Sequence, residues 1–101
     1  RLYNPIGLRV SWDYKELYIV DSGNSTIRSM DLNTLKVATL FGEPMQEGSL
    51  NDFGRKARFK KPTWITRDDL NWFVSDSGNH IIRRLQKNRN VSTYLGQSGI
   101  T

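Results

Sequence analysis

The chain has 101 residues, a formal net charge of +5 and no cysteine, so it has the size of one ordinary domain and holds neither a disulfide nor a thiolate metal site. With 37% hydrophobic and 25% charged residues, its composition is that of a folded protein and excludes disorder throughout. Its longest apolar runs, such as Leu17–Val20, are far shorter than the about 20 residues of a membrane span, so we expect no membrane insertion.

The first half of the chain reads as short strands. Runs rich in β-branched and aromatic residues alternate with turn residues, which is typical of an all-β protein. They predict strands at 6–12, 16–20, 26–31 and 36–41, with turns at 13–15 and 32–35.

The second half repeats this order. It predicts strands at 63–67, 71–75, 80–86 and 91–95, with turns at 68–70 and 87–90. Four antiparallel strands in each half correspond to one blade of a β-propeller. Because two blades cannot close a ring, we expect further blades, in the same chain or in an oligomer.

One loop occurs twice: "DSGNSTIR" at residues 21–28 returns as "DSGNHIIR" at 76–83, with six of eight positions identical. We expect both glycines to adopt positive φ, each Asp to accept backbone N–H groups of its turn, and each Arg to pair with an Asp across the hairpin. The pattern therefore predicts a structural motif. Its residues are Asp21, Gly23, Asn24, Arg28, Asp76, Gly78, Asn79 and Arg83.

The motifs around this loop carry a family resemblance. A proline followed by "LYIVDSGN", "IR" and "VATLFG" resembles the NHL repeat, a blade unit of β-propellers, and "GEPMQEGSLNDFGRKARFKKP" resembles the loop between two such blades. The resemblance implies one blade at residues 1–42, an inter-blade loop at 43–61 and a second blade at 62–101, within a propeller of six blades. Trp64 departs from it, since the family has glycine there, as at Gly7.

Positive charge is concentrated in the second half. Residues 1–54 hold five Lys or Arg against seven Asp or Glu, whereas residues 55–101 hold ten against three. A run in the inter-blade loop, interrupted by Phe59, could neutralise phosphates and stack a base, or could be a solvated loop with Phe59 in the core. The candidate binding residues of this run are Arg55, Lys56, Arg58, Lys60 and Lys61.

A second basic cluster comprises Arg84, Lys87 and Arg89, which have no basic counterpart in the first repeat and are therefore free for a binding role or for solubility. For Trp12, Trp64 and Trp72 we expect packing between sheets, with Trp64 the first candidate for an exception.

The sequence gives no sign of catalysis. His80 is the only histidine and the residues around it do not supply a zinc ligand set, while no serine has the glycine context of a nucleophile elbow. We therefore expect no catalytic residue, metal or cofactor in these two repeats.

The resemblance implies a non-catalytic binding scaffold that recognises a protein partner or another ligand. One alternative is single-stranded RNA binding through a basic face, which the charge of the second half favours and the acidic first half opposes. A second alternative is a metal-dependent propeller lyase or hydrolase. The sequence does not indicate a compartment.

Overall fold

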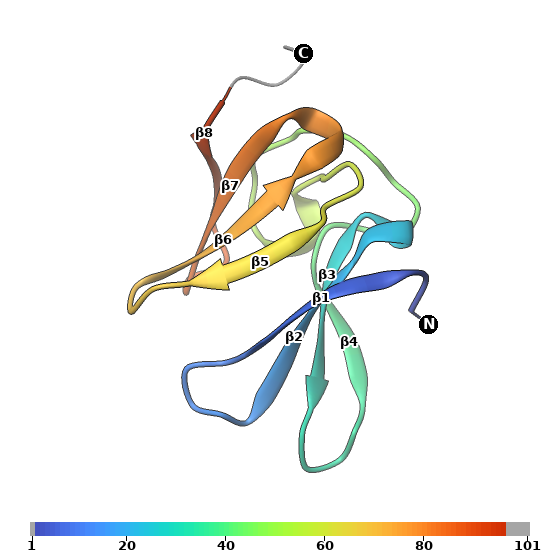
Figure 1. Cartoon of the computed structure of the whole chain (residues 1–101), viewed down its shortest axis with the longest axis vertical. Coiled ribbons are helices and arrows are strands. Elements are labelled where there is room, and N and C mark those ends of the chain that lie inside the picture. Colours follow the sequence, from blue (N-terminus) through green and yellow to red (C-terminus); the bar gives the residue numbers. More distant parts are fainter. Residues whose placement is uncertain (1, 97–101) are drawn as a thin grey trace.

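The computed structural model describes residues 2–96 and confirms the all-β prediction (Figure 1). Two antiparallel sheets of four strands follow each other in chain order, β1-β2-β3-β4 and β5-β6-β7-β8. Each has the form of a propeller blade, and they are called the first and the second blade below.

The first blade contains β1 (Pro5–Val10), β2 (Glu16–Asp21), β3 (Thr26–Asp31) and β4 (Val37–Phe41). Strand β1 ends two residues before its predicted end. Ser11 and Trp12 instead belong to the β1–β2 turn, because the Ser11 hydroxyl donates to Asp13 Oδ1 and accepts the Glu16 N–H.

The second blade contains β5 (Trp64–Arg67), β6 (Asn71–Asp76), β7 (Ile81–Gln86) and β8 (Val91–Leu95). Short 3₁₀ helices follow β2 and β6, η1 (Ser22–Asn24) and η3 (Ser77–Asn79), and a third, η2 (Gly54–Lys56), lies in the segment between the blades. We call that segment, residues 43–61, the link. Residues 97–101 of the predicted second segment lie outside the described residues.

The prediction that Gly23 and Gly78 adopt positive φ is wrong. The left-handed backbone is adopted by Ser25 (φ 56°) and His80 (φ 60°), while Gly23 and Gly78 have no positive φ. Glycine is required there because a Cβ would lie 2.2 Å from the Tyr3 carbonyl oxygen at Gly23, and 2.5 Å from that of Lys60 at Gly78. Each glycine thus admits a close backbone approach.

The core lies between the two blades. Strands β1 and β5 are in contact where the sheets meet, and the sheets fan apart from there (Figure 1). Apolar side chains from both blades and the link form one buried cluster around Trp72 and Phe59. Phe59 is completely buried, so it serves the core rather than the surface.

Among residues 2–96, no helix is long and apolar enough to cross a membrane.

Candidate functional site

The repeated polar residues fasten the chain at the entry to each blade. In the first blade, Asp21 accepts the Tyr3 N–H (2.7 Å) and the Asn24 amide (2.7 Å), and Arg28 forms an ion pair with it at 3.3 Å. Gly23 N–H donates to the Tyr3 carbonyl at 2.8 Å. The segment that leads into β1 is thereby tied to the loop after β2.

The second blade repeats this arrangement on the link. Asp76 accepts the Lys60 N–H (2.8 Å) and the Asn79 amide (2.9 Å) and pairs with Arg83 at 2.8 Å. Both side chains of that ion pair are fully buried. Burial raises the pKa of the Asp76 carboxyl, an effect that its three hydrogen-bond donors oppose.

Arg83 also holds the link directly. Its guanidinium donates to the carbonyl oxygens of Leu50 (2.9 Å) and Arg58 (2.8 Å) and to Asn51 Oδ1 (2.7 Å). Its Cζ lies 4.8 Å from the centre of the Phe59 ring. These contacts give the repeated residues a structural role in this fold.

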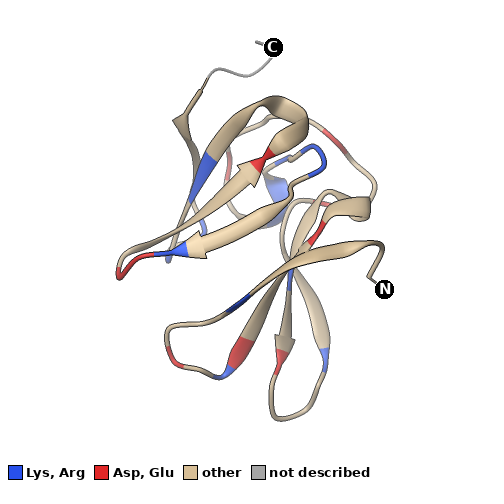
Figure 2. Ribbon diagram, in the orientation of Figure 1, with Lys and Arg blue, Asp and Glu red and all other residues tan. Residues whose placement is uncertain are grey.

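The basic run of the link is largely engaged within the link. Arg55 forms a salt bridge with Glu43 at 2.6 Å, and Lys61 forms one with Glu47 at 3.2 Å. Arg58 donates to the carbonyl oxygens of Arg55 and Ala57. Figure 2 shows that positive residues are spread over both sheets and the link rather than gathered in one segment.

Lys56 and Lys60 are the other two cations of this run, and both are exposed. Neither side chain has an ion pair with an acidic residue of the part that the structure describes. Whether the run binds a partner stays a prediction.

The second basic cluster is divided by the fold. Arg84 lies within β7, opposite Phe73 and Ser92, and is half-buried. Lys87 and Arg89 lie in the β7–β8 turn, where both line a cavity between the blades.

That cavity has a volume of about 210 Å³, and we call it the inter-blade pocket. It combines residues of the first blade with residues of the second. In Figure 1 the β1–β2 and β5–β6 turns both lie at the left. Its lining residues are Trp12, Tyr18, Phe41, Trp72, Gln86, Lys87 and Arg89.

Aromatic rings form the walls of the inter-blade pocket. Tyr18 stacks on Trp72 at 4.4 Å between ring centres, and Trp12 meets Trp72 edge-on at 4.8 Å. The Trp12 indole N–H donates to the carbonyl oxygen of Asp68 at 2.9 Å, which joins the β1–β2 turn to the second blade. Burial raises the pKa of Tyr18, so its hydroxyl stays protonated at neutral pH.

Two cations lie over these walls. Lys87 Nζ lies 4.7 Å from the centre of the Trp12 ring, and Arg89 Cζ lies 5.8 Å from that of Phe41. The backbone of Arg89 is held by the link, since Gly54 N–H donates to the Arg89 carbonyl at 2.7 Å. The link thus helps to fix the position of the β7–β8 turn, which carries both cations.

A second cavity of about 270 Å³ adjoins the inter-blade pocket and shares Trp12, Tyr18 and Lys87 with it. Its other lining residues are polar or acidic: Ser11, Asp13 and Glu16. Hydrogen bonds from the Ser11 hydroxyl and the Lys15 N–H lower the pKa of Asp13, which keeps this carboxylate ionised.

Three residues of the inter-blade pocket break the repeat. Leu32 and Leu35 of the β3–β4 turn take the places of Lys87 and Arg89, and both Leu35 and Arg89 have positive φ (65° and 74°). Trp12 lies where the first repeat is longer by two residues. Sequence reasoning singled out both cations but did not join them to Trp12, Tyr18, Phe41 or Trp72; departure from the repeat was the available signal.

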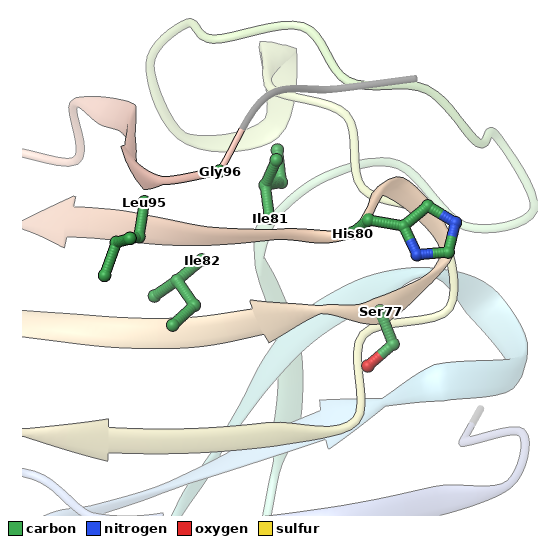
Figure 3. Close-up of a pocket in the computed structure, with 6 residues that line it drawn as sticks. All are labelled: Ser77, His80, Ile81, Ile82, Leu95 and Gly96. Carbon is green, nitrogen blue, oxygen red and sulfur yellow. The ribbon is translucent and has the colours of Figure 1, made fainter. Parts of the chain in front are cut away.

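A cavity beside His80 has a different character. It measures about 470 Å³ and is lined by Ser77, His80, Ile81, Ile82, Leu95 and Gly96, mainly apolar groups of the second blade (Figure 3). In Figure 3 the imidazole lies at the β6–β7 turn, away from Ile82 and Leu95. No group of three or more His, Cys, Asp or Glu in residues 2–96 could hold a metal ion.

The predictions for the tryptophans agree with the described packing. Trp72 is buried and Trp12 is half-buried against it, whereas Trp64, on β5, is 53% exposed. Trp64 does not line the inter-blade pocket.

No protein-family model and no curated protein matches this chain. Among solved structures, it is similar to two auxiliary nutrient binding proteins, from Bacteroides thetaiotaomicron (20% identity, TM-score 0.74) and Bacteroides ovatus (21%, 0.75), covering 88% of this chain and 25% of each of those chains. A putative phosphatase from Bacteroides thetaiotaomicron is similar to the same extent (21%, TM-score 0.73), with 88% of this chain and 22% of that chain covered. The chain therefore spans a quarter or less of these structures, and the likeness concerns the fold.

Proposed function

We propose that this chain forms two blades of an NHL-type propeller of about six blades. In this proposal it acts as a non-catalytic binding scaffold, and a ligand or a protein partner is recognised at the inter-blade pocket. The observation that carries this proposal is the pocket itself, in which aromatic walls from both blades meet Lys87 and Arg89. Pockets that combine aromatic walls with a few placed polar groups are typical of ligand sites.

The names of the similar structures support a binding role. Two are called nutrient binding proteins and one a putative phosphatase, so one fold of this kind serves different activities. The binding assignment rests on the geometry of the inter-blade pocket, and the names add weight to it.

The two alternatives have less support. For single-stranded RNA, much of the basic run in the link already contacts acceptors of the link, including Glu43 and Glu47. The metal-dependent lyase or hydrolase would need ligands from elsewhere, since residues 2–96 contain no group that could hold a metal ion.

The proposal is tested by a thermal-shift and tryptophan-fluorescence screen on the full-length protein. The panel contains neutral oligosaccharides, small organic anions, unstructured peptides and single-stranded RNA. Trp12→Leu removes one wall of the inter-blade pocket, and Trp64→Leu is the matched control, because it replaces an exposed tryptophan outside the pocket.

We expect at least one class to bind, with an affinity that falls about tenfold or more in Trp12→Leu and is unchanged in Trp64→Leu. An affinity that is unchanged in Trp12→Leu would contradict the proposal, as would a panel without any binder. RNA binding that is lost on changing Lys56 and Lys60 to Ser would instead favour the RNA alternative.

A further inference from the structure

The hydrogen-bonding groups of the inter-blade pocket are strongly biased toward donors. Lys87 and Arg89 supply charged donors, and neither has an ion pair with an acidic residue among residues 2–96. The acceptor Gln86 Oε1 is already engaged by the Asn90 amide at 3.0 Å. A ligand that satisfies these groups must therefore bring acceptors.

A buried donor gives the same indication independently of the charges. Trp72 is 1% exposed, and its indole N–H has no hydrogen-bond partner within the part of the chain that the structure describes. Buried donors are normally paired, so an unpaired one in a residue that lines a cavity favours a ligand that brings an acceptor. This donor belongs to a residue that lines the inter-blade pocket.

The adjoining cavity limits the charge of the ligand. Asp13 and Glu16 line this cavity together with Lys87, Trp12 and Tyr18. Each negative charge of a ligand is attracted by Lys87 and Arg89 and repelled by these two carboxylates, so the net attraction for a second negative charge is reduced. A phosphate monoester carries about −1.5 to −2 at neutral pH and is disfavoured on this ground.

The volume and the walls of the inter-blade pocket indicate the size and polarity of its ligand. A volume of about 210 Å³ corresponds to about seven water molecules in the liquid at about 30 Å³ each. The walls of Trp12, Tyr18 and Phe41 favour an apolar body. On these grounds we propose that the inter-blade pocket binds a small monocarboxylate with an apolar group, its carboxylate at Lys87 and Arg89. This assignment rests on the proposed binding function and names its ligand class.

The test uses benzoate as the probe, with benzamide as its neutral isostere and phenyl phosphate as the more highly charged analogue. Affinities are measured on the full-length protein by calorimetry at low ionic strength, because salt screens exposed charges. The key variant is Lys87→Leu/Arg89→Leu, which installs the residues that the first blade carries in the corresponding turn. Lys56→Leu/Lys60→Leu is the control, since it removes two exposed positive charges outside the pocket.

We expect benzoate to bind at least about tenfold more tightly than benzamide and phenyl phosphate, which corresponds to about 1.4 kcal/mol. The affinity should fall by at least the same factor in Lys87→Leu/Arg89→Leu and stay unchanged in the control. The melting temperature of each variant, measured in parallel, shows whether the turn still folds.

Three results would overturn the assignment: equal affinity for benzoate and benzamide, tighter binding of phenyl phosphate, or benzoate binding that survives the loss of Lys87 and Arg89. Absence of benzoate binding, together with another class that binds in a Trp12-dependent manner, would overturn the carboxylate alone and leave the proposed function intact. If no class binds, both fail.

Discussion

At the scale of single residues, the two Arg-Asp pairs explain why one loop occurs twice in the chain. Arg83 reaches Asp76 and three acceptors of the link from a fully buried position. Arg28 pairs with Asp21 at the equivalent place. The repeated residues thus connect each blade to the segment that enters it.

Arg83→Leu should lower the free energy of unfolding by about 3–5 kcal/mol, because it leaves a buried carboxylate without its ionic partner. Asp76 would keep only the Lys60 N–H and the Asn79 amide. Urea denaturation followed by circular dichroism measures this loss.

The double variant Arg83→Leu/Asp76→Leu is the informative companion. Replacing both members of a buried pair by apolar residues is often less costly than removing one, so part of the stability should return. If the single variant costs less than about 1 kcal/mol, the value of an exposed pair, the buried pair does not hold the link in the way described.

At the scale of elements, three turns are closed by aspartate side chains. Asp31 Oδ1 accepts the N–H groups of Asn33 and Thr34, and Asp68 Oδ1 accepts those of Leu70 and Asn71. These hydrogen bonds lower the pKa of both carboxyls from the ordinary value of 3.8. Asp13 closes the β1–β2 turn in the same way.

The lowered pKa values predict a loss of stability in acid. Because the folded state favours the ionised carboxylates, their stabilisation is complete above about pH 4 and disappears as the pH falls below that value. Asp68→Asn keeps an oxygen acceptor but cannot titrate, so its melting temperature should fall less steeply between pH 4 and pH 2 (about the range of this titration).

The control is Asp69→Asn at the adjacent exposed position, whose carboxylate accepts no hydrogen bond among the described residues. Melting curves followed by circular dichroism across this range compare the three proteins. An equal change in the two variants would show that the overall charge of the protein, rather than the turn hydrogen bonds, causes the loss of stability in acid.

The elements also show what the sequence could predict. Alternating β-branched and aromatic residues placed the eight strands, and the repeat indicated two equivalent blades. The end of β1 was mispredicted because Ser11 and Trp12 resemble strand residues, yet the Ser11 hydroxyl closes a turn. The role of Gly23 and Gly78 was missed because it depends on backbone from another part of the chain.

The inter-blade pocket could not be predicted from sequence patterns, for a related reason. Its members come from positions 12 to 89, and they meet only because the second blade packs on the first in one particular way. Lys87 and Arg89 could be selected from the sequence as unrepeated cations, but their position above Trp12 and Phe41 is a tertiary property.

At the scale of the whole molecule, the two blades differ in what covers equivalent positions. Ile27 and Phe41 of the first blade are almost completely buried, and Phe59 of the link packs beside Gly42. Their equivalents in the second blade, Ile82 and Leu95, line an open cavity of about 470 Å³ (Figure 3). We propose that this cavity receives an apolar side chain of a further blade unit, as the first blade receives Phe59.

Ile82→Asp/Leu95→Asp tests this proposal in the full-length protein, with Leu32→Asp/Leu35→Asp as the control, because Leu32 and Leu35 lie in the exposed β3–β4 turn. If a blade covers the cavity, the first pair buries unpaired carboxylates and should lower the free energy of unfolding by several kcal/mol, about 3 or more, whereas the control should change it by about 0.5 kcal/mol or less. Chemical denaturation gives both values. Equal, small effects would mean that the face of Ile82 and Leu95 stays in contact with solvent, and the packing of a further blade at this place would have to be abandoned.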